Sequence, residues 1–427
     1  MAERVDTLIT NLREVVTMRD PEGDSTGPRR GEAMSRIGVI VDGAIAIRGG
    51  DIVAVGPERE LCELYDAAET VNGGDRVALP GFVDPHTHLP FSGTRERDFE
   101  ARILGKSYTE IALEGGGIRS TMRATRKASK DELIAAGRVR LDRMLEQGTT
   151  SAEAKSGYGL DLDTERRQLE AVHELDRTHP VELVATNLAA HEVPDEYRED
   201  KEGYLKLLEE SLLPELKDLA TFVDVFCEDH VYSVEESRRI LTRAKELGYK
   251  LKIHADEIEP IGGTEMACEL GAVSADHLGR VSDEGIAKLA STGTIGVVLP
   301  GTTFYLNLKH KAPARRMIEA GCALALATDL NPGSCLTESM PAILTIAAVD
   351  LRMTPAEVLT AATINAAHAI ARGDRVGSLE AGKQADIVLW SAPTWRYIPS
   401  HFGVNLVDRV FKAGELVVSE GRRITAA

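Results

Sequence analysis

A short apolar run, Leu79–Val83, is followed by two alternating histidines in the segment Leu79-Pro80-Gly81-Phe82-Val83-Asp84-Pro85-His86-Thr87-His88. Seven further apolar runs follow along the chain, each trailed by a longer helical pattern. They are Thr149–Glu153, Val181–Leu188, Phe222–Phe226, Leu251–His254, Ala272–Ala275, Thr294–Leu299 and Leu324–Thr328. Strands that alternate with helices are typical of a parallel sheet, and eight such units match a (β/α)8 barrel in count and length. The sequence therefore predicts an α/β fold with a TIM-like barrel over residues 79–374.

The main rival is a doubly wound open sheet. That fold usually places a glycine-rich phosphate turn directly after its first strand. Here the same position holds Asp84-Pro85-His86-Thr87-His88. The barrel is therefore the favoured fold.

Both ends of the chain have a different sequence pattern, in which short alternating apolar runs are broken by Gly, Asp and Asn, as is typical of β-strands. Arg36–Ile47 and Ile52–Gly56 lie before the barrel region, and Ala385–Trp390 and Val407–Val418 lie after it. We expect residues 1–78 and 375–427 to form one composite β-sandwich domain beside the barrel.

The overall charge disfavours nucleic acid as a partner. The chain of 427 residues has 68 acidic and 50 basic side chains and a net charge of −18. Such a surface repels phosphate backbones and anionic lipid headgroups. A small anionic substrate can still bind where a local cluster of arginine, backbone amides and a cation outweighs the global field.

Cysteine usage favours a cytoplasmic protein. The five cysteines are widely spaced, odd in number and without a CxxC pair, which indicates reduced thiols. No stretch is apolar enough for a membrane helix, and the first residues lack the pattern of a secretory signal. We expect neither secretion nor membrane insertion.

Metal-binding residues follow several of the predicted strands, where barrel enzymes place their sites. His86 and His88 follow the first strand, His254 ends the fifth, and Asp329 follows the eighth. Alternate residues of an extended segment point the same way, so His86 and His88 can reach one ion. Three imidazoles and one carboxylate suit one divalent or trivalent transition metal, with Zn²⁺ and Fe³⁺ both compatible.

Such a metal lowers the pKa of a bound water and yields a hydroxide nucleophile, so the expected chemistry is hydrolysis. Glu257 and His277 also follow strands and are candidates to transfer the proton or to stabilise an oxyanion. Asp329 is a further candidate base. The sequence does not distinguish which of these three side chains carries the proton.

The segment from Pro80 to His88, together with His254, His277, Asp329 and the β-rich tail, resembles the amidohydrolase superfamily. Further stretches resemble its imidazolonepropionase family, whose members open the ring of imidazolone propionate to N-formimidoyl-L-glutamate in histidine degradation. They are Gly93–Glu100, Gly115–Ile118, Glu153–Leu160, His254–Glu257 and Ala327–Ser334. The combination spans nearly the whole barrel and is more specific than any single motif.

The resemblance implies a role for each matched position. His86, His88, His254 and Asp329 would be the metal ligands. The substrate contacts would be Arg95, Tyr158, His191 and Glu257, and the open-chain product would be held by Asn331, Gly333 and Ser334. The resemblance also implies a homodimer.

Chemistry agrees with these assignments, because Arg95 can grip a carboxylate with two parallel hydrogen bonds and the backbone amides around Gly333 and Ser334 can hold a second one. Lys155 follows the second strand, not the fourth, where some relatives carry a metal-bridging lysine. We therefore expect one metal and a structural or electrostatic lysine.

Two alternatives stay open at this stage. A different amidohydrolase, such as a deaminase of a heterocycle or of a guanidine compound, would release ammonia without opening imidazolone. A non-catalytic scaffold would usually have lost its metal ligands, whereas all four candidates are present here.

Overall fold

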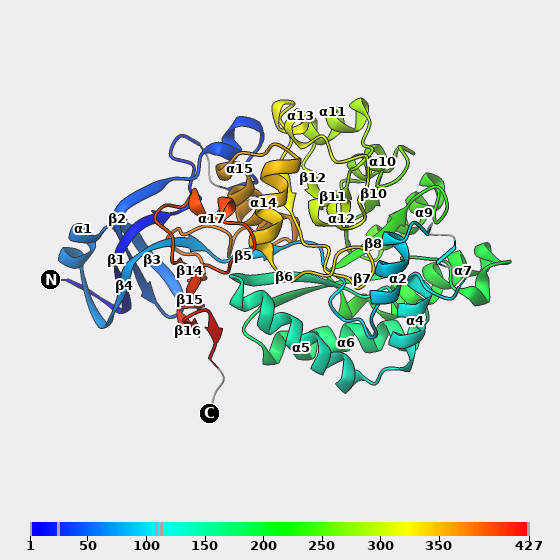
Figure 1. The fold of residues 1–427 in the computed structure, drawn as a ribbon, viewed down its shortest axis with the longest axis horizontal. Helices are drawn as coiled ribbons and strands as arrows, with labels where there is room; N and C mark the ends of the chain where they lie inside the picture. The colour runs from blue at the N-terminus through cyan, green and yellow to red at the C-terminus, as the bar shows by residue number, and fades with distance from the viewer. Residues whose placement is uncertain (1, 24–25, 107–109, 112–113, 425–427) are drawn as a thin grey trace.

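The computed structural model describes residues 2–23, 26–106, 110–111 and 114–424, and these form two sheets. A parallel sheet closes into a barrel, and a separate mixed sheet lies at one side of it, where both termini are found (Figure 1). This arrangement confirms the predicted fold class.

The barrel contains eight strand positions in parallel order, with the fifth position broken into two short strands. The strands are β5 (Phe82–Asp84), β6 (Thr149–Lys155), β7 (Glu182–Ala190), β8 (Phe222–Cys227), β9 (Lys250–Leu251), β10 (His254–Ala255), β11 (Ser274–His277), β12 (Ile295–Val298) and β13 (Leu324–Leu326). Pairing runs in chain order from β5 to β13. A parallel bridge between Thr87 and Leu330 joins the first position to the last and closes the ring.

The first barrel strand is shorter than the sequence predicted. Leu79 and Pro80 belong to β4 of the terminal sheet, where they pair with Val388 and Ile387 of β14. Gly81 separates the two sheets, and β5 begins at Phe82. An apolar run alone could not show this division, because both sheets bury the same kind of side chain.

Helices follow most of the barrel strands. Their bounds are α2 (Glu96–Ile103), α4 (Ile118–Lys127), α5 (Lys130–Glu146), α6 (Leu162–Thr178), α7 (Lys201–Leu207), α8 (Leu213–Glu215), α9 (Val234–Glu246), α10 (Gly263–Leu270), α11 (Asp283–Ser291), α12 (Pro300–Tyr305), α13 (Ala314–Glu319), α14 (Met340–Asp350), α15 (Pro355–Ala362) and α16 (Ile364–Ala369). Ser129 and Ser233 start α5 and α9 with complete capping boxes, which satisfy backbone N–H groups that a helix start leaves free. Within the described part of the chain, every helix is too short or too polar to cross a lipid bilayer.

The terminal sheet is built from both ends of the chain. Its strands are β1 (Glu3–Val16), β2 (Val39–Arg48), β3 (Asp51–Pro57), β4 (Tyr65–Pro80), β14 (Ile387–Trp390), β15 (Val407–Lys412), β16 (Glu415–Ser419) and β17 (Arg422–Arg423), with the short helices α1 (Glu58–Leu64) and α17 (Tyr397–Ser400) beside them. The antiparallel pair of β4 and β14 joins the N-terminal half of this sheet to the C-terminal half. The division of the chain at residues 78 and 375 stays a proposal.

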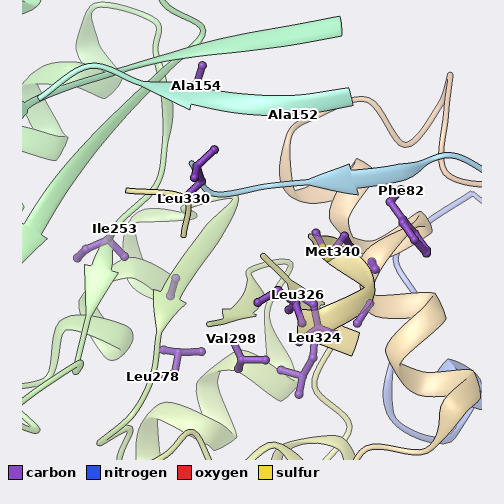
Figure 2. Packing of buried hydrophobic residues seen from close by; sticks show 14 of the residues in the cluster. Phe82, Ala152, Ala154, Ile253, Leu278, Val298, Leu324, Leu326, Leu330 and Met340 are labelled. Carbon is purple, nitrogen blue, oxygen red and sulfur yellow. The ribbon is translucent and has the colours of Figure 1, made fainter. Parts of the chain in front are cut away.

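The core lies between the barrel and its helices. Leu324 and Leu326 of β13 lie near Val298 of β12, and Met340 of α14 packs into the same cluster (Figure 2). All four side chains are fully buried. Burial of such residues removes apolar surface from water and holds the strand ends in fixed positions, and those ends carry the polar residues of the site.

Candidate active site

Three histidines and one aspartate meet at the carboxyl ends of the barrel strands. The ligand nitrogens of His86, His88 and His254 all lie within 4.8 Å of one another. Asp329 Oδ1 lies 3.6 Å from His86 Nε2 and 3.4 Å from His88 Nε2. The structure thus brings together the four residues that the sequence predicted as metal ligands.

Unsatisfied polar atoms at this point fit a bound cation. His86 Nε2, His254 Nε2 and Asp329 Oδ1 are buried and have no hydrogen-bond partner in the described part of the chain. Buried polar atoms are rarely left in that state, because each pays the full cost of losing water. A transition metal would accept lone pairs from all of these atoms at once.

Two buried carboxylates orient the histidine rings. His86 Nδ1 donates to Asp276 Oδ2 at 2.6 Å, and His254 Nδ1 donates to Asp224 Oδ1 at 3.1 Å. A proton held on Nδ1 leaves the Nε2 lone pair free for a metal. Sequence reasoning missed both carboxylates, although a charged residue inside an apolar strand, as at Asp224 in β8, was an available signal.

Two buried lysines balance these carboxylates. Lys155 Nζ lies 2.7 Å from Asp224 and 2.8 Å from Glu153, and Lys252 Nζ lies 3.1 Å from Glu153. Burial opposes the charge of Lys155, but Asp224 and Glu153 raise the pKa of its ammonium above the ordinary value. Lys155 is therefore a buried, ion-paired cation beside the carboxylates that orient the histidines, and its electrostatic role stays a prediction.

Replacing Asp276 by asparagine should weaken metal binding by about 10-fold to 100-fold, because His86 would lose the carboxylate that orients its ring. Metal content after dialysis against a graded series of chelator concentrations measures this effect. Asp283→Asn, at an exposed position on α11, is the matched control. Equal metal retention by Asp276→Asn and the wild type would contradict the prediction.

A cavity of about 210 Å³ opens above the four candidate ligands. His88, His254 and Asp329 lie in its wall, whereas His86 is fully buried. The other predicted site residues also line it: Arg95, Tyr158, His191, Glu257, His277, Asn331, Gly333 and Ser334. Residues from distant parts of the sequence therefore share one small cavity, although their individual roles stay predictions.

The cavity also contains residues that the sequence analysis did not select. Arg102, Phe226 and His230 all line it. His230 comes shortly after the fourth predicted strand, at a position intermediate between the strand ends and the surface histidines, and was not selected for the site. Arg102 lies in the last turn of α2, seven residues after Arg95, the N-cap of that helix, and this spacing of about two helical turns was a signal that the two arginines lie near each other.

Glu257 and His277 lie side by side in the cavity, with Glu257 Oε1 3.5 Å from His277 Nδ1. Burial, assisted by the charge of Asp329, raises the pKa of Glu257 to about 8. Burial lowers the pKa of His277 to about 3. At neutral pH the pair thus combines a carboxyl group that can donate a proton with a neutral imidazole.

Arg95 is held in place by an aspartate and a glycine. Its Nε donates to Asp98 Oδ2 at 2.7 Å, which leaves the two terminal nitrogens free of this contact. A Cβ added at Gly333 would overlap Arg95 Nη1. The missing side chain at Gly333 is therefore what allows the guanidinium to lie where it does.

Replacing Gly333 by alanine should raise the KM for a carboxylate substrate by about 10-fold to 100-fold, which corresponds to the loss of one charge-assisted hydrogen bond from Arg95. The turnover number should change much less, because the metal ligands are untouched. Steady-state kinetics measures both values. Gly293→Ala, where an added Cβ meets no atom within 4 Å, serves as the control, and an unchanged KM in Gly333→Ala would contradict the prediction.

The loop after Asp329 is organised by Asn331. Asn331 Oδ1 accepts hydrogen bonds from the backbone amides of Gly333 and Ser334, each at 2.8 Å. Those amides, which the sequence analysis offered to a second carboxylate, are therefore already engaged. Ser334 lines the same cavity, and its hydroxyl also donates to Asn331 Oδ1, at 3.0 Å.

His191 presents an acceptor to the cavity. Its Nδ1 donates to the carbonyl of Gly157 at 2.9 Å, and burial lowers the pKa of the ring well below its ordinary value. A neutral ring with the proton on Nδ1 offers Nε2 as a lone pair for an N–H group. The residue that supplies this carbonyl is suited to glycine, because Gly157 has a φ of +102° and an added Cβ would meet Leu188 O at 2.8 Å.

Tyr158 is held by the same turn. Glu165, fully buried, accepts backbone N–H groups from Gly157, Gly159 and Leu160 with its carboxylate. This brings the Tyr158 ring to 5.4 Å from that of His191. Sequence reasoning missed Glu165, which lies in a helix with many other acidic residues.

Backbone strain is concentrated at this rim. Asp256, His277 and Asp329 have φ values of +50°, +76° and +54°, in the left-handed region that non-glycine residues rarely adopt. Such conformations cost free energy and persist where the surrounding structure enforces them, often at functional sites. Here they occur at or beside three candidate catalytic positions.

Comparison with known proteins identifies the family. The model of the amidohydrolase family matches residues 77–417, which is most of the chain. Imidazolonepropionase of Symbiobacterium thermophilum is 51% identical over 424 residues, and that of Bacillus velezensis is 50% identical over 421, each covering 98% of both chains. This chain belongs to the amidohydrolase family, among the imidazolonepropionases.

Solved structures agree with the fold of this amidohydrolase. An adenosine deaminase from Xanthomonas campestris with bound zinc has a TM-score of 0.75 at 21% identity, covering 100% of this chain and 96% of its own. N-isopropylammelide isopropylaminohydrolase from Burkholderia multivorans has a TM-score of 0.70 at 19% identity, covering 98% and 100%. At these identities the likeness shows the barrel and its companion sheet, and not the substrate.

Proposed function

We propose that this amidohydrolase opens the ring of imidazolone propionate and releases N-formimidoyl-L-glutamate. The observation that carries the proposal is one small cavity with three histidines and Asp329 at its base and Arg95 in its wall. Relatives about half identical over nearly the full length, named imidazolonepropionase, support the same substrate. The planar ring of this substrate would lie beside the candidate metal ligands, and its propionate tail would lie beside Arg95.

His86, His88, His254 and Asp329 would hold the metal, with Zn²⁺ or Fe³⁺ as the candidates that three imidazoles and a carboxylate accept. When bound, such a cation makes a water acidic enough to lose a proton near neutral pH. Asp224 and Asp276 keep Nε2 of two of these histidines free of protons. The buried lysines prevent these carboxylates from adding uncompensated negative charge.

Substrate recognition is assigned to cavity residues other than the metal ligands. Arg95 grips the propionate carboxylate through its free guanidinium nitrogens. Tyr158 donates its hydroxyl to the same carboxylate, and His191 Nε2 accepts the N–H of the ring. Asn331, Gly333 and Ser334 form the loop that contacts the open-chain product.

The reaction itself needs two proton transfers. Asp329 accepts a proton from the attacking water, whose oxygen adds to the ring carbonyl carbon. The C–N bond of the ring then breaks, and Glu257 supplies the proton that the leaving nitrogen takes up. His277, beside Glu257, stabilises the negative charge that develops on the carbonyl oxygen. Water and substrate together account for all atoms of the product.

The direct test follows imidazolone absorbance in the presence of the purified protein, with and without added Zn²⁺ or iron. We expect absorbance to disappear and N-formimidoyl-glutamate to accumulate, with no ammonia released. No loss of absorbance under any of these conditions would reject the proposal. Ammonia release from a heterocyclic amine or a guanidine compound, without ring opening, would favour a deaminase instead.

Two further properties remain predictions. A homodimer is what the resemblance implies, and reduced cysteines favour a cytoplasmic location. The five thiols are free in the structure. Sedimentation of the purified protein tests the first, and fractionation of the source cell tests the second.

A further inference from the structure

A second arginine lines the cavity from α2, the helix that follows Arg95, its N-cap residue. Arg102 lies in the last turn of α2, and its guanidinium lines the cavity together with Arg95. Its Nη1 donates to the carbonyl of Gly333 at 2.8 Å, and its guanidinium carbon lies 5.4 Å from the centre of the Tyr305 ring. The side chain is therefore anchored on one side and open on the other.

Charge balance distinguishes the two arginines. Arg95 is paired with Asp98, whereas Arg102 has no carboxylate within 4.0 Å in the described part of the chain. Burial lowers the pKa of Arg102 and Tyr305 opposes this, while the charge of Arg95 lowers the pKa further and the more distant charge of Asp98 raises it. Half-buried cations without a counter-ion are costly, and an anionic ligand relieves that cost.

We propose that Arg102 is a second contact of the substrate carboxylate, and that it selects ligands with an acidic tail over neutral ones. This inference rests on the proposed function, since it assigns a further residue to that substrate. Arg95, the N-cap of α2, and Arg102, in its last turn, would together hold the two carboxylate oxygens, with Gly333 next to both guanidinium groups. Neither the family motifs nor the spacing of the metal ligands pointed to Arg102.

A purely structural role is the competing explanation, because Arg102 also anchors the Gly333 carbonyl. The two roles differ in one measurable respect. An anchor would affect acidic and neutral ligands equally, whereas a carboxylate contact would affect only the acid. The probes are imidazole-4-propanoate and the corresponding propanamide, which share a ring and a tail length but differ in charge.

Calorimetric binding of both probes to the metal-loaded protein provides the test. In Arg102→Gln we expect affinity for the acid to fall by about 10-fold to 100-fold, the loss of one charge-assisted hydrogen bond, with little change for the amide. Arg102→Met is a second neutral variant that keeps the packing of the stem, and Arg102→Lys should retain part of the preference. Arg97→Gln, at an exposed position on the same helix, should behave as the wild type.

Equal weakening of acid and amide in the neutral variants, or unchanged affinity for the acid, would overturn the inference. Turnover of imidazolone propionate by the wild type is measured alongside. A wild type that prefers the acid but does not turn over imidazolone would count against the proposed function alone. A wild type that is active, with neutral variants whose KM is unchanged, would count against Arg102 alone.

Discussion

His254→Ala should reduce ring opening by on the order of 1,000-fold or more, because the site would lose the water of lowered pKa that a bound metal provides. His254 contributes one of three clustered ligand nitrogens, and its ring is fixed by Asp224. Its removal leaves two histidines and Asp329 to hold the ion. Metal content should fall together with activity, and both are measured on the same dialysed sample.

The control for this variant is His310→Ala, at an exposed position that follows no barrel strand. It should keep full activity and full metal content. Retention of both metal and activity by His254→Ala would show that the cluster is not the metal site. In that case the proposed chemistry has no nucleophile.

Glu257→Gln should lower the turnover number by about 100-fold to 10,000-fold, the range for loss of a general acid or base. Glutamine keeps the shape of the side chain but has no proton to pass to the leaving nitrogen. Burial and the charge of Asp329 already favour the protonated carboxyl in the native protein, with a pKa of about 8. Metal content should be unchanged, which separates this effect from that of His254→Ala.

Glu259→Gln is the matched control, since Glu259 is an exposed carboxylate two residues further along the same loop. Single-turnover kinetics shows whether the chemical step itself is slowed. A turnover number of Glu257→Gln within a few-fold of the wild type would remove Glu257 from the proton path and leave His277 and Asp329 as the candidates. The proposed substrate would survive that result, whereas the proposed proton path would not.

The local sequence pattern of apolar runs and helical segments was sufficient to predict the architecture of the barrel. Apolar runs followed by helical segments predicted eight strand positions, and the structure has them. The failure at Leu79 and Pro80 is instructive, because these residues are as buried as those of β5 but pair with β14, some 300 residues away in the chain. A strand belongs to the sheet that contains its pairing partner, and the residues of an apolar run do not show which other strand it will pair with.

The candidate ligands could also be predicted from the sequence, since a barrel brings the carboxyl ends of its strands to one rim. His86, His88 and Asp329 follow strands and His254 lies at the end of one, so their convergence needed only the correct topology. The positions of Asp224, Asp276 and Lys252 in the site could not be predicted in this way. Asp224 and Asp276 are charged residues inside strands, Lys252 lies in the break between β9 and β10, and the role of each depends on which side chain faces it inside the barrel.

What the sequence determined by itself was therefore the kind of fold, the family and the residues at the strand ends, because these depend on periodicity and on position along the chain. Only the tertiary structure decided that Arg102 shares the cavity with Arg95, that Gly333 must lack a side chain beside it, and that Asn331 occupies the loop amides. Such contacts depend on distances between segments that are remote in sequence. Packing determines those distances, and no local pattern encodes them.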